Sequence, residues 1–150
     1  DLKKILPAEI SLEKNHVDFM RSASPKVQAL LTRATIVATL LKREKELAGA
    51  LFNYIHVQKK VFTSVADIRK VFVENGVDGA KFDKLMKSFS VTSKAKMMKK
   101  YQDQLSKQGA LTGVPTFVVN GQYVIERQAL DKKNYVEDFN NLVKYLQTLK

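Results

Sequence analysis

Apolar residues recur every three or four positions through the middle of the chain, which is the spacing of one helix face. The first such stripe follows Ser24 and Pro25, residue types that favour an N-cap and a first helical position. Its apolar members are Val27, Leu30, Leu31, Ala34, Val37 and Leu41. The pattern predicts an amphipathic helix that begins near Pro25.

Four more helices are predicted before residue 109. The sequence SVAD at 64–67 is a capping-box pattern with Asp in place of Glu, and Gly76 and Gly109 are suited to close the helices that precede them. The apolar stripes of these helices are, in chain order, Leu47, Leu51, Tyr54 and Ile55; Ile68, Val71 and Phe72; Phe82, Leu85, Met86 and Phe89; and Ala95, Met98 and Leu105.

Strand character is predicted on both sides of the helices. Residues 9–19 carry apolar side chains on both parities, as in a strand that is covered on both faces. Residues 117–125 contain two short apolar runs joined by Asn120 and Gly121, the strongest short hairpin signal. A last helical stripe follows, with the members Tyr135, Phe139, Leu142, Val143, Leu146 and Leu149.

The predicted order of elements is a strand, five helices, a hairpin and a helix. A lone strand cannot bury itself, so we expect the first strand to join the hairpin across the intervening helices. The fold class is therefore α/β, with a small sheet interrupted by an inserted all-helical domain. We place the sheet-bearing part at residues 1–20 and 109–150 and the helical insertion at residues 21–108.

Composition and charge narrow the choice of function. The 150 residues are 45% hydrophobic, as in a globular domain, and no apolar run is long enough to span a bilayer. The 26 basic and 15 acidic residues give a net charge of +11, and five of the basic residues are arginines. Lysine lacks the planar fork that reads phosphates and bases, so this charge favours loose attraction to anionic surfaces over specific recognition of nucleic acid.

Side chains that support common catalytic or metal chemistry are few. The histidines, His16 and His56, have no carboxylate or thiol at ligand spacing, so we expect structural roles for both and no metal site. No phosphate-binding glycine loop or nucleophile elbow is present, and no cofactor is implied. The basic run at 94–100 is more typical of a solvated helix face, with a patch for anionic surfaces as the alternative.

Two residues carry more specific expectations. Lys14 shares strand parity with Ile10 and Leu12, so it either points into a covered layer or lies near the strand end and extends to water. Pro115 stands at the start of the predicted hairpin and cannot donate a backbone hydrogen bond. A trans proline could simply begin the strand. A cis bond could instead leave backbone groups free to accept an extended peptide.

The stretch GVPTFVVNGQYV at 113–124 resembles the cis-proline loop and hairpin of the DsbA family of thioredoxin-fold disulfide oxidoreductases. Residues 6–20, LPAEISLEKNHVDFM, resemble that family's strand after the active-site helix. Residues 64–83 and 88–115 resemble its inserted helical domain and the long helix that leads back, and residues 141–150 resemble its last helix. The resemblance covers nearly the whole chain in the right order.

The resemblance implies a thioredoxin-like fold, incomplete at its N-terminus, that is interrupted by an all-helical domain. It implies that Pro115 is cis, and that Lys14 matches a buried lysine that tunes the redox site. The residues implied to bind substrate are Gly113, Val114, Pro115 and Thr116, with Gln128 and Leu130 on the far wall of the groove.

One departure from the family is large, because the chain contains no cysteine and hence no Cys-x-x-Cys motif. We therefore expect a fragment of a thiol:disulfide oxidoreductase that is inactive as given and that begins after the dithiol. The alternatives are a redox-inactive, chaperone-like peptide-binding module and a basic helical adaptor for anionic surfaces. An upstream Cys-x-x-Cys would distinguish the first two, and steep salt dependence of binding would indicate the third.

The resemblance also implies partners and a compartment. The intact protein would act in the periplasm on unfolded or reduced exported polypeptides, and a quinone-linked membrane reoxidase would restore its disulfide. No nucleic-acid partner is expected. An unpaired sheet edge in the incomplete fold would favour self-association of the chain.

Overall fold

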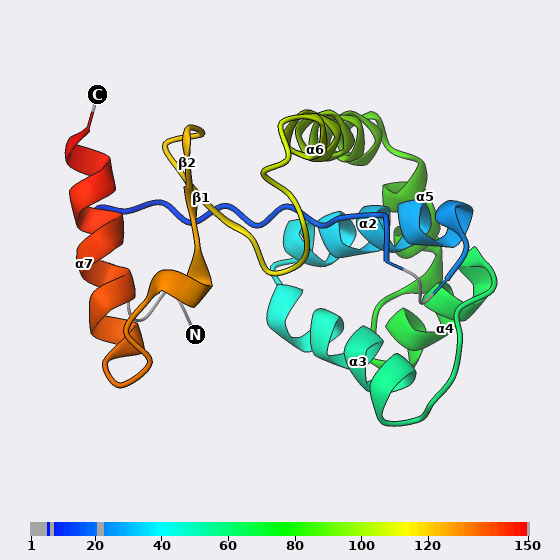
Figure 1. The fold of residues 1–150 in the computed structure, drawn as a ribbon. Helices are drawn as coiled ribbons and strands as arrows, with labels where there is room; N and C mark the ends of the chain where they lie inside the picture. Colours follow the sequence, from blue (N-terminus) through cyan, green and yellow to red (C-terminus); the bar gives the residue numbers. More distant parts are fainter. Residues whose placement is uncertain (1–5, 7, 21–22, 150) are drawn as a thin grey trace. The chain divides into compact units, whose positions relative to one another are not determined.

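The structure is a computed structural model that describes residue 6, residues 8–20 and residues 23–149. Helices make up most of this part of the chain, and a short hairpin precedes the last helix (Figure 1). The elements are α2 (Pro25–Leu40), α3 (Glu44–His56), α4 (Val65–Glu74), α5 (Gly79–Lys87), α6 (Phe89–Lys107), β1 (Phe117–Val119), β2 (Tyr123–Ile125), the 3-10 helix η1 (Arg127–Ala129) and α7 (Tyr135–Thr148).

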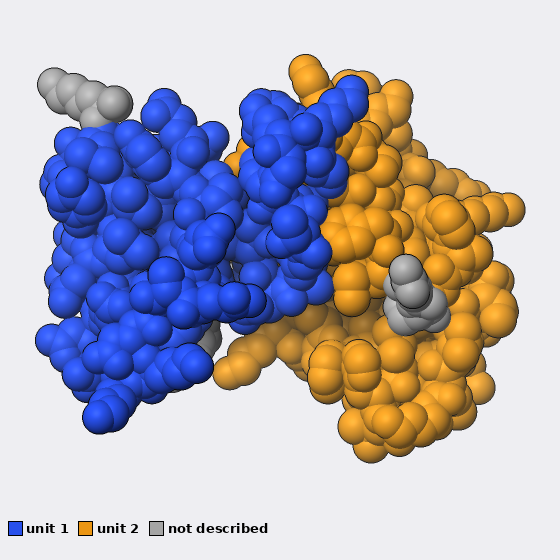
Figure 2. Space-filling view, in the orientation of Figure 1, with its two compact units in different colours: residues 1–14, 104–150 blue, residues 15–103 orange. Residues whose placement is uncertain are grey.

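The chain divides into two compact units, which Figure 2 shows in different colours. The helical unit comprises Asn15–Asp103, and the hairpin unit comprises Asp1–Lys14 and Gln104–Lys150. Helix α6 begins in the helical unit, and its last residues belong to the hairpin unit. The sequence prediction placed these boundaries a few residues later, at 20 and 109.

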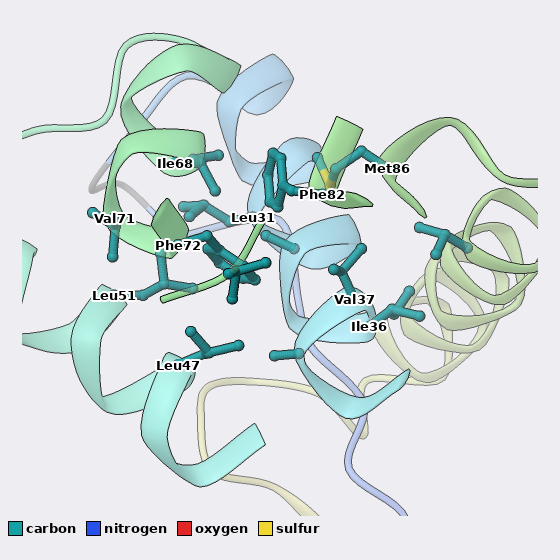
Figure 3. Packing of buried hydrophobic residues seen from close by; sticks show 14 of the residues in the cluster. Leu31, Ile36, Val37, Leu47, Leu51, Ile68, Val71, Phe72, Phe82 and Met86 are labelled. Carbon is teal, nitrogen blue, oxygen red and sulfur yellow. The ribbon is translucent and has the colours of Figure 1, made fainter. Parts of the chain in front are cut away.

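The core of the helical unit is built from the predicted apolar stripes. Phe72 and Phe82 are both fully buried, and their ring centroids lie 4.8 Å apart. Side chains from α2, α3, α4 and α5 point toward this pair from several sides (Figure 3). The other large, fully buried side chains of this core are Leu47, Ile68, Val37 and Val91.

Helix ends in this unit follow the signals in the sequence. The Ser24 hydroxyl accepts a hydrogen bond from the Val27 N–H at 3.4 Å, and Pro25 opens α2. The Asp67 carboxylate accepts one from the Ser64 N–H at 3.0 Å, which is the expected capping-box contact. Gly76 ends the α4 turn with φ +77°, a left-handed conformation that suits glycine.

The predicted inward position of Phe89 is wrong, because this side chain is 86% exposed. Helix α5 ends at Lys87, and the backbone of Ser88 is extended with ψ 151°. The Ser88 hydroxyl then accepts a hydrogen bond from the Val91 N–H at 3.3 Å and so caps the start of α6. Phe89 therefore belongs to a new helix and leaves the stripe that Phe82 and Met86 share.

The hairpin unit contains an antiparallel pair, β1 and β2, in the register Phe117↔Ile125, Val118↔Val124 and Val119↔Tyr123. Asn120 and Gly121 have φ of +53° and +70°, as a tight two-residue turn requires. Helix α7 packs Phe139 and Val143 against Val119, Ile125 and Leu130. Leu6 and Ile10 from the start of the chain also contact this cluster.

The predicted strand at 9–19 is wrong, because β1 and β2 are the strands found in the described residues. Side chains of the helices hold the later part of this segment. The Asp18 N–H donates to Gln102 Oε1 at 2.8 Å, and Gln28 Nε2 donates to the Met20 carbonyl at 2.7 Å. These hydrogen bonds replace ladder bonds, and they explain why residues 15–20 belong to the helical unit.

Candidate functional site

The loop at 110–116 connects α6 to the hairpin and carries four of the predicted site residues. Gly109 ends α6 with φ +70°, and the Ala110 N–H donates to the Leu105 carbonyl at 2.9 Å. The end of the helix is thereby fixed where the loop begins. At the other end of the loop, Phe117 starts β1 and packs against Phe139 with ring centroids 5.0 Å apart.

The peptide bond between Val114 and Pro115 is cis, the isomer that the resemblance implies. Both side chains are exposed, whereas Gly113 and Thr116 are half-buried. The Thr116 hydroxyl donates a hydrogen bond to the Gly113 carbonyl at 2.7 Å, which closes the loop across the proline. The loop therefore presents Val114 and Pro115 outward from a fixed base.

The backbone of Val114 is available for binding. Neither its N–H nor its carbonyl has a hydrogen-bond partner within the described residues. A residue with one free donor and one free acceptor can pair with an extended peptide in the manner of an added strand. The Val114 side chain, 44% exposed, adds apolar contact area beside these groups.

The other two predicted substrate-binding residues lie in different environments. Gln128 is exposed in η1. Leu130 is 5% exposed and belongs to the cluster that contains Ile125 and Phe139. Leu130 therefore supports the packing of the hairpin unit, and Gln128 alone of this pair offers a side chain to solvent.

The prediction that Lys14 is buried is wrong, because the residue is exposed. The family resemblance implied this burial, whereas strand parity with Ile10 and Leu12 left both burial and extension to water open. The segment forms no strand, so alternate residues do not have to face opposite layers. Ile10 and Leu12 are themselves half-buried rather than enclosed.

The two histidines are far from this loop in sequence and have unlike surroundings. His56 is exposed, and its ring lies tilted against that of Phe52 with centroids 4.2 Å apart. His16 is half-buried, and its Nδ1 lies 2.7 Å from the Thr32 hydroxyl. Burial lowers the pKa of His16, although the nearby Asp18 carboxylate opposes the shift. The described part of the chain contains no group of three or more His, Cys, Asp or Glu side chains that could hold a metal ion.

Asp18 fastens the same segment to α6. Its carboxylate accepts hydrogen bonds from Gln102 Nε2 at 2.7 Å and from Lys99 Nζ at 3.2 Å. Burial by itself would raise the pKa of Asp18, but these hydrogen bonds hold it below its ordinary value. The arrangement is structural, because both partners stabilise the charged carboxylate in place.

A shallow polar cavity of about 410 Å³ lies between α3 and α4, and no pattern in the sequence indicated it. Its lining includes the carboxylates Glu46 and Glu74 and the amides Asn53 and Asn75. Glu46 is already engaged by Arg43, whose guanidinium also donates to the Asn75 carbonyl. Glu74 Oε1 lies 3.9 Å from Lys70 Nζ, so both carboxylates that line the cavity are ion-paired.

The chemistry open to the Val114 loop is binding rather than bond-making. The chain contains no cysteine, so no thiol can attack a disulfide from these 150 residues. The loop supplies a backbone donor, a backbone acceptor and two exposed apolar side chains. These are the groups that hold an extended peptide in register.

Comparison with known proteins places this geometry in a family. Residues 3–136 match the model of the DSBA-like thioredoxin domain. The thiol:disulfide interchange protein DsbA of Dickeya dadantii is 34% identical over 152 residues, which cover 99% of this chain and 69% of that protein. The DsbA of Salmonella typhimurium is 36% identical over 149 residues, which cover 97% of this chain and 68% of that protein.

Solved structures agree with the sequence comparison. A cysteine-to-serine variant of Proteus mirabilis DsbA, solved with a non-covalently bound peptide PWATCDS, is 28% identical and superposes with a TM-score of 0.81. The match covers 97% of this chain and 75% of that one. DsbA from Klebsiella pneumoniae is 30% identical, with a TM-score of 0.79 over 97% of this chain and 74% of that one.

The described part of the chain has no helix of the length and apolarity needed to cross a bilayer.

The family match and the superposed structures show that the fold is α/β and thioredoxin-like with a helical insertion, as the sequence predicted. The chain belongs to the DSBA-like thioredoxin domain family, the family of DsbA-type thiol:disulfide oxidoreductases.

Proposed function

We propose that this chain is the peptide-binding part of a thiol:disulfide oxidoreductase that acts on reduced, extended polypeptides. The observation that carries the proposal is the Val114 backbone, whose N–H and carbonyl have no partner in the described residues. A relative from Proteus mirabilis was solved with the peptide PWATCDS bound, which supports the same ligand class here.

The disulfide has to come from cysteines outside these 150 residues. A substrate thiolate attacks one sulfur of that disulfide, forms a mixed disulfide and releases the other sulfur as a thiolate. The second substrate thiolate then attacks the substrate sulfur of the mixed disulfide. The substrate leaves oxidised, and two electrons remain on the dithiol. In this scheme residues 113–116 hold the substrate strand in register during both steps.

The proposal extends to the setting of the reaction. Exported polypeptides fold in an oxidising compartment, so we place the activity in the periplasm. Each turnover leaves a reduced dithiol, which requires an oxidant before the next. A quinone-linked membrane protein is the partner that the family resemblance suggests. Lys14 and Gln128, both exposed, remain proposed contributors to redox tuning and to substrate contact.

Peptide binding can be measured on the 150-residue chain itself. We expect PWATCDS to bind in a calorimetric titration. Peptides in which one backbone N–H at a time is replaced by an ester oxygen should then locate the paired position. Loss of one backbone hydrogen bond should weaken binding by ~0.5–1.5 kcal/mol. Absence of binding, or equal affinity for every ester analogue, would contradict the backbone-pairing proposal.

A second candidate function is a redox-inactive peptide-binding module, and the absence of cysteine favours it. Both candidates predict peptide binding, so a different measurement has to separate them. Thiol titration together with the intact mass of the natural protein does so. A dithiol in the natural protein supports the oxidoreductase, and a thiol-free protein of the same mass as this chain supports the module.

A further inference from the structure

Helix α6 presents a strongly basic outward face. Lys96 and Lys100 are exposed and have no ion-pair partner among the described residues. Residues 89–102 contain no Asp or Glu at all. Asp103, the first acid that follows, is engaged by Lys99 at 2.9 Å. The described part of the chain therefore offers no ion-pair partner for the charges of Lys96 and Lys100.

Two large apolar side chains are exposed on the same helix. Phe89 is 86% exposed, and Met97 is 69% exposed. At 100° per residue, Phe89, Lys96 and Lys100 fall on one line along the helix, and Met97 lies beside it. Val91 and Met98, which are buried, mark the opposite side. Helix α6, located in Figure 1, therefore has a core face and an outer face, and the outer face combines lysines with apolar side chains.

We propose that this face, defined by Phe89, Lys96, Met97 and Lys100, docks on the surface of a membrane that contains anionic phospholipid. Lysines attract the phosphate groups of the lipids, and each acts as a point charge without a fixed orientation. Phe89 and Met97 then enter the boundary between headgroups and acyl chains. The proposal is independent of peptide binding at residues 113–116.

Nucleic acid fits the same face less well. Backbone and base recognition draws on arginine forks and stacked aromatic residues. The described arginines of the helical unit are engaged elsewhere, since Arg33 donates to the Met86 carbonyl and Arg69 pairs with Asp83 at 3.0 Å. Phe89 is a lone exposed aromatic residue on α6, and Tyr101 is half-buried. Apolar insertion explains Phe89 and Met97 more directly than base stacking does.

Vesicle co-sedimentation of the 150-residue chain tests the proposal. We expect binding to vesicles of phosphatidylcholine that contain phosphatidylglycerol, and little binding to phosphatidylcholine alone. The double substitution Lys96→Gln/Lys100→Gln should weaken binding on the order of 30-fold. Phe89→Ser should weaken vesicle binding on the order of tenfold. This loss should not depend on the salt concentration, because it comes from apolar contact rather than from charge.

Matched controls distinguish vesicle binding through this face from binding through the net charge or the overall apolarity of the chain. Lys26→Gln/Lys45→Gln removes the same charge from exposed positions on α2 and α3. Phe52→Ser removes an aromatic residue that is 61% exposed on α3. Both controls should bind vesicles as the unmodified chain does, and circular dichroism should show the same helix content for all four variants.

Three outcomes would overturn the proposal. The first is no binding to vesicles that contain phosphatidylglycerol. The second is an equal loss in the face variants and their controls, which would indicate attraction through net charge alone. The third is tighter binding to single-stranded DNA or RNA than to vesicles, with loss in Lys96→Gln/Lys100→Gln, which would assign the face to nucleic acid.

Discussion

The two units of this chain bury their side chains to different extents. The largest fully buried side chains among the described residues, Phe72 and Phe82 foremost, all belong to the helical unit. The hairpin unit relies on a smaller cluster around Ile125, Leu130 and Phe139. Helices satisfy their own backbone groups, so neighbouring helices can enclose a core, whereas a two-stranded hairpin needs support from another element.

That difference bears on where binding takes place. The loop at 113–116, in which the Val114 backbone has no hydrogen-bond partner among the described residues, belongs to the less densely buried unit. Binding loops are drawn from the less stable parts of proteins, because a ligand must displace or complete local hydrogen bonding. The helical unit is built as a scaffold, and its outer surface on α6 offers charge rather than backbone groups.

The largest effect is expected from a cavity in the helical core. Phe72→Ala should lower the free energy of unfolding by ~3–5 kcal/mol, because Phe72 is fully buried against Phe82. Urea denaturation followed by far-ultraviolet circular dichroism measures this loss. Val73→Ala, at a position that is 42% exposed on the same helix, is the control. Equal losses for the two variants would show that the enclosed core does not stabilise the helical unit as described.

A smaller effect is expected from the same kind of change in the hairpin unit. Leu130→Ala should cost about 2 kcal/mol, near the low end for such truncations, because a small cluster can relax around the cavity. Hydrogen exchange should show faster exchange in β1, β2 and α7 and unchanged protection in α3 and α4. Gln128→Ala, at an exposed position, should leave exchange unchanged. Weaker peptide binding in Leu130→Ala without faster exchange would instead return Leu130 to the binding site.

Sequence patterns predicted the elements whose causes are local. The cap at Ser24, the capping box at Asp67 and the turn at Asn120 each depend on residues within a few positions of one another. The loop at 113–116 was predicted from its proline and from the family resemblance. The structure was needed to show that the loop is exposed and that the Val114 backbone is unpaired within the part of the chain that is described.

The failures occurred where distant residues decide the conformation. The pattern at residues 9–19 predicted a strand, and the resemblance implied a buried Lys14 on it, yet Gln28 and Gln102 hold the later part of that segment by side-chain hydrogen bonds. Gln102 lies 84 residues from Asp18, so no local pattern indicates this contact, whereas Gln28 lies only eight residues from Met20. Phe89 was wrongly predicted to face inward. The cause is local and is visible in the sequence, since Ser88 is a favoured N-cap residue and starts a new helix.

Acid pH should weaken the attachment of residues 15–20 to the helical unit. The pKa of His16 is below its ordinary 6.5 in the folded chain, because burial disfavours the charged ring. Its contribution to stability is therefore complete above pH 6.5 and is lost as the pH falls through 6.5 toward the folded pKa. As the pH is lowered through this range, the midpoint of unfolding should fall more steeply for the unmodified chain than for His16→Gln. The stability lost in this way should be smaller than the loss caused by Phe72→Ala or by Leu130→Ala.

The exposed His56 provides a control for replacing histidine, as His56→Gln. Asp18 titrates in a separate window, because its folded pKa lies below 3.8 and its contribution is lost as the pH falls through that lower value. A slope near pH 6.5 that His16→Gln does not change would show that His16 is not the group that loses stability there.

The smallest expected effect on stability is the loss of an N-cap side chain, tested on one helix in each unit. Asp78 caps α5 by accepting a hydrogen bond from the Lys81 N–H at 2.7 Å, so Asp78→Ala should cost ~1 kcal/mol. Asn134 precedes α7 and makes no such side-chain hydrogen bond, so Asn134→Ala should change stability very little. Urea denaturation of both variants gives the difference directly. A cost at Asn134 equal to that at Asp78 would mean that α7 depends on its own cap, and that the hairpin unit is stabilised by local signals as much as the helical unit is.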